Sequence, residues 1–336
     1  MEFGLFYQLP CGPDQSAAQR YDDMIAEAQV ADRLGFDSIW LAELHFNARF
    51  SVMPSPLLAA AAIARTTSNI TIGTAVNLVS LHHPVRLAEE TATLDILSRG
   101  RAIFGIGRGS NANHFEGYGI DQTEGRESFR EAVDFILKAW TSEELTYKGQ
   151  YYQAKGLSVV PKPYQKPHPP VYVASNSADT FELVGSMGHN ILVGPLIATT
   201  EGVQSGLRRY RTELTNQGYD PAGTRVNLAL PTHVAPDAGR GYSEMRPTID
   251  AYLNTLRSTS GRRGSSRADV LNYDIVYEEY GIIGDPQRCV DRLRYFVDLM
   301  DPQEIMCWFN MGGTLSFDEV TASMELFAQE VMPHFQ

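Results

Sequence analysis

Apolar residues recur along the chain in two alternating patterns, short runs typical of strands and longer stretches with the spacing of an amphipathic helix. The runs predict eight strands, at residues 2–8, 38–43, 70–76, 102–107, 171–174, 190–194, 226–234 and 304–309. The stretches predict helices at residues 17–34, 56–67, 84–97, 124–140, 178–187, 201–215, 286–299 and 317–332. Strict alternation predicts a parallel sheet, and eight repeats favour a closed barrel. We therefore expect an α/β fold of the (β/α)8 TIM-barrel type, with an open doubly wound sheet as the alternative.

Two segments interrupt this alternation. Residues 141–170 contain three tyrosines and the sequence PKPYQKPHPP, which is incompatible with a helix and predicts a small hairpin followed by an extended loop. Residues 258–281 begin STSGRRGSSR and follow the seventh strand, where a barrel places active-site loops. We expect one domain over residues 1–336 with insertions after strands 4 and 7, the second being either a water-excluding lid or a surface loop.

Charge and composition narrow the class of partner. The net charge of −12 opposes binding to nucleic acids or anionic membranes, because both require clustered Lys and Arg, so a small-molecule substrate is expected. Three scattered cysteines do not form a disulfide framework. The N-terminus lacks the pattern of a signal peptide, and the longest uncharged stretch is too polar for a membrane span. We expect a cytoplasmic protein.

Polar residues gather where the predicted strands end, which is where a TIM barrel builds its active site. These strand-end residues are Gln8, Glu43, His45, Asn77, Arg108, Ser175, Asn176, Ser177, Thr232, His233 and Asn310. Glu43 and His45 would share a face of an extended strand, because alternate residues point the same way. This pair is our candidate for acid–base chemistry, although His45 could equally be a structural residue of the barrel rim.

The residues at the strand ends could also form a metal site. His45, His83 and His233 could surround an ion together with Glu43. Metal-dependent hydrolases on this fold generally carry two histidines separated by one residue at the first strand, whereas residues 6–8 read Phe-Tyr-Gln. We expect no metal.

Two features predict a phosphate site. The run FGIGRGS at residues 104–110 fails as a dinucleotide fingerprint, because Ser110 replaces the third glycine and no helix pattern starts before about residue 122. It still offers Arg108, whose guanidinium can bind a phosphate. On the next strand, Asn176, Ser177 and Thr180 open a helix whose free N–H groups attract anions. Taken singly, Arg108 could be a surface arginine and the polar residues could only cap the helix, but side by side these groups predict a phosphate site.

Several motifs together resemble the bacterial luciferase-like, flavin-dependent monooxygenases over nearly the whole chain. They are MEFGLF, LGFDSIWLAELHF, ITIGTAV, HHPVRLAEE, LDILSRGRAIFGIGRGS, PPVYVASNSADT and SMELFAQEVMP. The resemblance implies a (β/α)8 barrel, expected to be a homodimer, that binds reduced FMN supplied by a separate flavin reductase. It implies an oxidoreductase that uses O2 to hydroxylate or Baeyer–Villiger-oxidise a small organic substrate.

The resemblance also implies roles for individual residues. The family's phosphate contacts fall on Arg108, Ser177, Thr180 and the backbone around Asn176. A non-proline cis peptide beneath the flavin ring would correspond to Ala75–Val76. From the residues themselves, we expect His45, oriented by Glu43, to transfer protons during oxidation.

Two departures from the family pattern limit what carries over. Leu44 stands where the light-emitting subunit has the first of two histidines, and Gly107 stands where that subunit has a cysteine, which would enlarge the space there. Light emission from a long-chain aldehyde is therefore not expected. Two alternatives remain open: a deazaflavin-dependent dehydrogenase or reductase, and a non-catalytic flavin-binding protein or subunit of a heterodimer.

Overall fold

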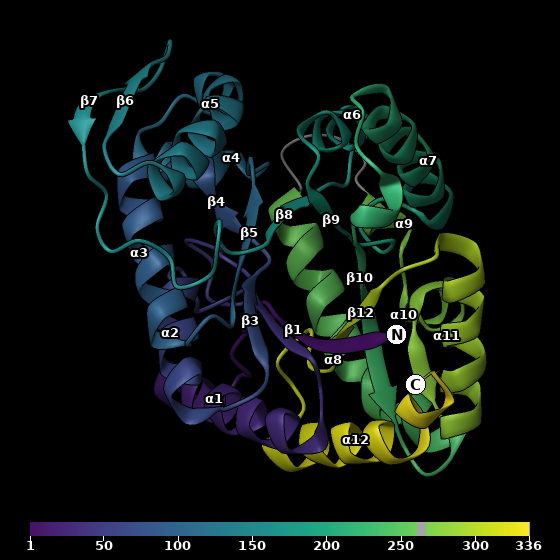
Figure 1. The fold of residues 1–336 in the computed structure, drawn as a ribbon. Coiled ribbons are helices and arrows are strands. Elements are labelled where there is room, and N and C mark those ends of the chain that lie inside the picture. The colour runs from purple at the N-terminus through teal and green to yellow at the C-terminus, as the bar shows by residue number, and fades with distance from the viewer. Residues whose placement is uncertain (261–266, 336) are drawn as a thin grey trace.

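Eight parallel strands close into a barrel in the computed structural model, which describes residues 1–260 and 267–335 (Figure 1). The barrel strands are β1 (Glu2–Tyr7), β2 (Ser38–Leu41), β3 (Thr71–Thr74), β5 (Ala102–Gly107), β8 (Val171–Ala174), β9 (Asn190–Val193), β10 (Val226–Val234) and β12 (Glu304–Trp308). Each pairs in parallel with its neighbours, and β12 pairs with β1 to close the ring. The predicted (β/α)8 barrel is confirmed.

The helices that follow these strands form the outer layer (Figure 1). They are α1 (Ala17–Leu34), α2 (Pro56–Thr66), α3 (Pro84–Leu97), α5 (Gln122–Thr141), α6 (Ala178–Met187), α7 (Thr200–Asn216), α11 (Pro286–Met300) and α12 (Phe317–Glu330). Their ends are defined by caps: Ser16 accepts a hydrogen bond at the start of α1, and Gly35 ends that helix in the left-handed conformation, with φ +83°. No helix in residues 1–260 or 267–335 is long and apolar enough to cross a membrane.

The sequence patterns did not predict several further elements. These are α4 (Ala112–Tyr118), α8 (Ala238–Ser260), α9 (Arg267–Val270), α10 (Tyr273–Ile275), β4 (Asn77–Leu78), β11 (Ile282–Gly284) and the short helices η1 (Val79–Leu81), η2 (Pro221–Gly223), η3 (Val276–Tyr280) and η4 (Met332–His334). The prediction that no helix begins before residue 122 is wrong, because Asn111 caps α4 and buried Phe115 anchors it. Pro247 lies inside α8, yet Met245, Ile249 and Leu253 form a buried face on it.

Additional elements interrupt the barrel pattern at two places. Between α5 and β8, strands β6 (Leu145–Lys148) and β7 (Gln153–Leu157) pair as the predicted antiparallel hairpin. Between β10 and α11, the chain forms α8, α9, α10, η3 and β11. Residues 261–266 of the predicted lid lie outside the described residues. In the part that follows, Leu271, Tyr273 and Val276 are buried in the core, so that part of the segment is packed against the barrel.

A buried carboxyl group joins several strands at the end of the barrel where the strands begin. Glu304 at the start of β12 accepts hydrogen bonds from the Ser38 hydroxyl, from Trp40 Nε1 at 2.7 Å and from Asn227 Nδ2 at 2.6 Å. Gly4 leaves room for this group, since a Cβ there would lie 2.4 Å from Glu304 Oε1. Burial raises the pKa of Glu304 to about 7.

This raised pKa predicts a pH-dependent stability. The pKa of Glu304 in the folded protein lies above its ordinary value of 4.5, so protonation of this group stabilises the fold. This stabilisation is complete below pH 4.5 and is lost as the pH rises to about 7. A shift of this size corresponds to on the order of 3 kcal/mol. We expect the free energy of unfolding in urea to fall over this range in the wild type but not in Glu304→Gln.

The Glu304→Gln amide fits its surroundings, because Asn227 Oδ1 has no hydrogen-bond partner in the described chain and can accept from it after a flip of the Asn227 amide. Glu330→Gln, at the exposed end of α12, is the control and keeps the wild-type slope. An equal slope in the wild type and Glu304→Gln would contradict the assignment.

Candidate active site

Two connected cavities open where β2, β3, β5 and β8 end. One has a volume of about 440 Å³ and is lined by several charged and polar residues, among them Arg108 and Ser177. The other has a volume of about 200 Å³ and is lined mainly by apolar residues. Both are lined by Glu43, Leu44, Val76, Leu78, Ala174, Asn176 and Ile197. The arrangement therefore offers one continuous site with a polar end and an apolar end.

Two side chains that line the polar end donate hydrogen bonds to a carboxylate of the protein. Arg108, which follows β5, donates from Nη2 to Asp179 Oδ2 at 3.0 Å, and the Ser177 hydroxyl donates to Asp179 Oδ1 at 2.6 Å. These groups meet because β5 and β8 are neighbours in the barrel. The hydrogen bonds from Ser177 and Arg108 lower the pKa of the Asp179 carboxyl. The structure thus brings Arg108 and Ser177 together, and both contact a carboxylate that sequence reasoning did not single out.

Thr180 and Asn176 shape this wall. Thr180 Oγ1 lies 2.7 Å from Ser175 Oγ and accepts from the Ser177 backbone N–H at 3.2 Å, so it forms a capping box that fixes the first turn of α6. Asn176 Oδ1 accepts from the Gly194 N–H at 3.2 Å and ties the end of β8 to the end of β9. Both residues line the polar cavity, as predicted site residues would.

Arg126 was missed by sequence reasoning. It lies on α5, far from any strand end in the sequence, and it lines the same polar cavity as Arg108. The spacing of residues along α5 points to Arg126 only once the fold shows which face of the helix covers the cavity. The polar end is therefore lined by two arginines rather than one.

The peptide between Ala75 and Val76 is cis, at the position that the family resemblance implied. Ala75 lines the apolar cavity and Val76 lines both cavities. The expectation that Gly107 enlarges this space is wrong: a Cβ at Gly107 would lie 2.6 Å from Val76 Cγ2, so the Val76 side chain already fills the volume.

Glu43 is the buried centre of a hydrogen-bond network. Its Oε1 lies 2.8 Å from His45 Nε2 and 2.8 Å from His82 Nε2, and its Oε2 accepts from the Leu78 N–H at 2.8 Å. Burial alone would raise the pKa of Glu43, but the bonds to His45 and His82 hold it below its ordinary value. Burial likewise opposes the charge on His82, yet the bond to Glu43 raises the pKa of His82. Glu43 is therefore an ionised carboxylate at the junction of the two cavities.

The structure pairs Glu43 with His45, as predicted, but it does not place His45 on a cavity wall. The His45 side chain is only 2% exposed and lies behind Glu43, with Nδ1 3.3 Å from the Tyr118 hydroxyl. Leu44 lines both cavities instead, and His114, whose Nε2 accepts from the His45 backbone N–H, lines the polar one. His82, with 29% of its side chain exposed, is the more accessible partner of Glu43.

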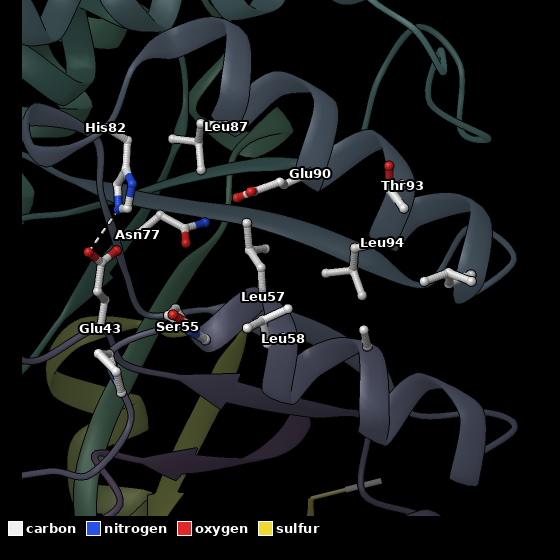
Figure 2. Close-up of a pocket in the computed structure, with 14 residues that line it drawn as sticks. Glu43, Ser55, Leu57, Leu58, Asn77, His82, Leu87, Glu90, Thr93 and Leu94 are labelled. Atoms are coloured by element: carbon white, nitrogen blue, oxygen red, sulfur yellow. Dashed lines mark hydrogen bonds and ion pairs between the residues drawn. The ribbon is translucent and has the colours of Figure 1, made fainter.

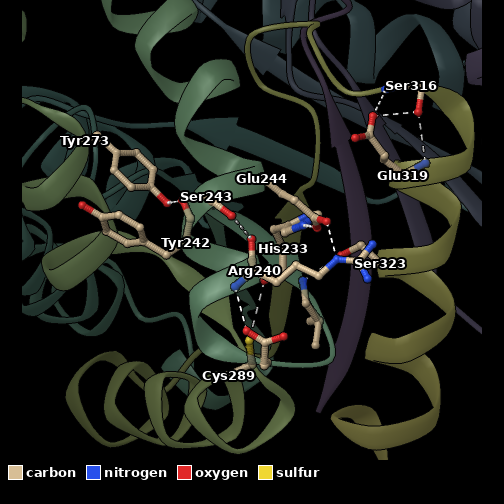
Figure 3. Close-up of polar contacts among 12 residues, drawn as sticks. His233, Arg240, Tyr242, Ser243, Glu244, Tyr273, Cys289, Ser316, Glu319 and Ser323 are labelled. Carbon is tan, nitrogen blue, oxygen red and sulfur yellow. Dashed lines mark hydrogen bonds and ion pairs between the residues drawn. The ribbon is translucent and has the colours of Figure 1, made fainter.

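The other histidines weighed for a metal site lie in different surroundings. His83 caps the start of α3. His233 hydrogen bonds through Nε2 to Glu244 at 2.9 Å, in a polar cluster with Arg240 between α8 and α12 (Figure 3). The set of three histidines around Glu43 is therefore not assembled.

Glu43 also lines a third cavity, of about 300 Å³, between α2 and α3 (Figure 2). Leucines from both helices form most of its apolar wall, and the 75% exposed Leu58 lies on its α2 side. The Glu43–His82 bond closes one end of this groove. The network thus connects the barrel cavities with the flank formed by α2 and α3.

Comparisons with known proteins agree with this architecture. The family model described as luciferase-like monooxygenase matches residues 1–302. The oxygenase component of flavin-dependent trigonelline monooxygenase from Acinetobacter baylyi is 29% identical over 350 residues, covering 100% of this chain and 96% of that protein.

Solved structures show the same fold. Monooxygenase RslO1 from Streptomyces bottropensis matches with a TM-score of 0.91 and 26% identity, covering 100% of both chains. The oxygenating constituent of 3,6-diketocamphane monooxygenase from Pseudomonas putida, a type II Baeyer–Villiger monooxygenase solved with FMN, matches with a TM-score of 0.85 and 20% identity, covering 100% of this chain and 99% of that chain. This chain belongs to the luciferase-like monooxygenase family and is an oxidoreductase.

Proposed function

We propose that the protein is the oxygenase component of a two-component system. It takes reduced FMN from a separate flavin reductase and uses O2 to oxidise a small organic substrate. The oxidation is either a hydroxylation or the insertion of an oxygen atom beside a carbonyl group. One observation carries the proposal: an anion site at Arg108 and Ser177 joins directly onto an apolar cavity. The relative named as flavin-dependent and the fold neighbour with bound FMN support it.

The residues present fit FMN. The Asp179 carboxylate on Arg108 and Ser177 shows that this donor set accepts an anion, which is what a terminal phosphate requires. The start of α6 adds backbone N–H groups and the positive end of its dipole. The adjoining apolar walls, which include Ala75, suit a flat ring. Bound reduced flavin supplies the two electrons with which one oxygen atom of O2 reaches the substrate and the other leaves as water.

The chain's own groups would then position the substrate and handle protons. The apolar cavity of about 200 Å³, lined by Phe6, Leu192, Met306 and Trp308 among others, favours a compact and largely apolar substrate. The ionised Glu43 Oε1 accepts hydrogen bonds from His82 and His45 and can take up a proton at the junction of the cavities. His45 is buried and acts only through its hydrogen bond to Glu43.

Oxygen chemistry tests the proposal directly. The protein is mixed without oxygen with photoreduced FMN, oxygen is admitted, and the hydrogen peroxide yield is measured with a panel of cyclic ketones, aldehydes and pyridine carboxylates. A substrate lowers the peroxide yield and takes up one atom from 18O2. Binding of deazaflavin with oxygen-independent hydride transfer would instead establish the dehydrogenase. Flavin binding without coupling to any panel member would favour the non-catalytic alternative.

We further propose a homodimer formed through α2 and α3, which lie side by side on one flank (Figure 1). The groove between them is apolar, and Leu58 is 75% exposed (Figure 2). We expect sedimentation to give twice the chain mass of 37.3 kDa. Leu58→Asp should shift the protein to a monomer, because a buried charge opposes association. Val270→Asp, an equally apolar and 68% exposed position on α9, is the control. A monomeric wild type would refute the interface.

A further inference from the structure

Asp179 places a negative charge against two side chains of the predicted phosphate site. It is the second residue of α6, after the N-cap Ser177. Its two carboxylate oxygens accept from Arg108 Nη2 at 3.0 Å and from Ser177 Oγ at 2.6 Å. Arg108 and Ser177 are the side chains that would hold the phosphate. An internal anion therefore uses the donors that an external anion needs.

The exposure of the two partners shows which of them can move. The Arg108 side chain is 20% exposed, whereas the Asp179 side chain is 69% exposed. A carboxylate that largely faces water loses little when it leaves an ion pair, since water replaces the lost contacts. Arg108 lines the cavity and Asp179 faces mainly water, so a phosphate that enters the cavity can take the place of Asp179 at the guanidinium.

Displacement does not remove the charge of Asp179 from the site. The residue stays on the first turn of α6, next to the position of the phosphate, and an aspartate that faces water is ionised at neutral pH. Two like charges at one helix start repel, which works against the attraction that the helix N-terminus gives to the phosphate. Asp179 therefore weakens phosphate binding twice, through competition for donors and through repulsion.

We propose that Asp179 competes with the flavin phosphate for Arg108 and Ser177 and so sets a flavin affinity low enough for repeated exchange with a reductase. This inference rests on the proposed function. An oxygenase that receives reduced flavin and returns oxidised flavin at each turnover needs a site that releases its ligand. Asp179 supplies that release without altering the walls that contact the ring.

Asp179→Asn tests the competition, because asparagine keeps the shape and still accepts from Ser177 but lacks the charge. Asp318→Asn is a matched control: Asp318 is also the second residue of a helix, α12, which also begins with a serine N-cap and a capping box. Both variants lose the same helix-dipole contribution. Only Asp179 contacts Arg108.

Calorimetric titrations with FMN, riboflavin and inorganic phosphate give the readout. We expect Asp179→Asn to bind FMN and inorganic phosphate about fivefold more tightly than the wild type, with the gain shrinking at high salt. Riboflavin, which has no phosphate, should bind all three proteins equally. Asp318→Asn should match the wild type.

The outcomes separate this inference from the proposed function. Equal or weaker binding of both FMN and inorganic phosphate by Asp179→Asn overturns the competition, even if the protein proves to be an FMN oxygenase. Tighter phosphate binding by Asp179→Asn upholds the competition for the site, even if the oxygen assay finds no coupling. Tighter binding in Asp318→Asn as well would reduce the effect to net charge and also overturn the inference.

Discussion

Arg108→Ala is expected to weaken FMN binding by about a hundredfold while changing riboflavin binding by less than about twofold. The guanidinium lies in the wall of the polar cavity, where it is 20% exposed and partly shielded from water, so its hydrogen bonds to an anion are stronger than on an open surface. Its loss also leaves Asp179 without its cation next to the phosphate. Titration of both flavins by fluorescence quenching measures the difference.

A control separates the local effect from a general loss of positive charge. Arg209→Ala removes an arginine on α7 whose side chain is 53% exposed and pairs with Glu182 at 3.4 Å, and it should leave both flavin affinities unchanged. In the Arg108→Ala background, the gain from Asp179→Asn should shrink, because the two residues contact each other and their effects are not additive. If Arg108→Ala weakens FMN and riboflavin binding equally, the phosphate site lies elsewhere.

The barrel could be predicted because each repeat carries its signal locally. Strands β5, β8 and β10 begin and end where the apolar runs do, since every residue in them is committed to the sheet. Helix α8 escaped prediction because Gly239, Gly241 and Pro247 mask a buried face that forms only against the barrel. Local propensity was overridden there by packing.

The site was predictable where it follows from strand order and not where it depends on distant loops. Arg108 and Ser177 end neighbouring strands, so their proximity follows from the fold alone. His82 reaches Glu43 from 39 residues away, after the turn formed by η1, and no spacing in the sequence reports such a contact. His45 was predicted to share a strand face with Glu43 on the assumption that β2 continues past Leu41, but the strand ends there. The side-chain alternation of a strand therefore no longer applies, and Leu44 faces the cavities instead.

Glu43→Gln is expected to lower substrate turnover by about a hundredfold or more, with FMN affinity changed by less than about twofold. The glutamine amide can still accept from the Leu78 N–H, which preserves the local backbone, but it cannot take up a proton at the junction of the cavities. Turnover in the wild type should fall in acid as pH drops through the lowered pKa of Glu43, and this acid limb should be absent in Glu43→Gln. A variant that turns over like the wild type would reduce Glu43 to a structural role.

The same turnover assay distinguishes the two histidines that hydrogen bond to Glu43. His82 has 29% of its side chain exposed and a raised pKa, whereas His45 is 2% exposed, so His82 is the better placed to exchange protons with water. We expect His82→Ala to slow turnover more than His45→Ala. The free energy of unfolding, measured for each variant in urea, corrects for lost stability, because removing one partner of a buried ion pair destabilises the fold. Glu330→Gln, which alters an exposed carboxylate at the end of α12, should leave turnover unchanged. Equal slowing in all four variants would show that stability, and not proton transfer, limits the rate.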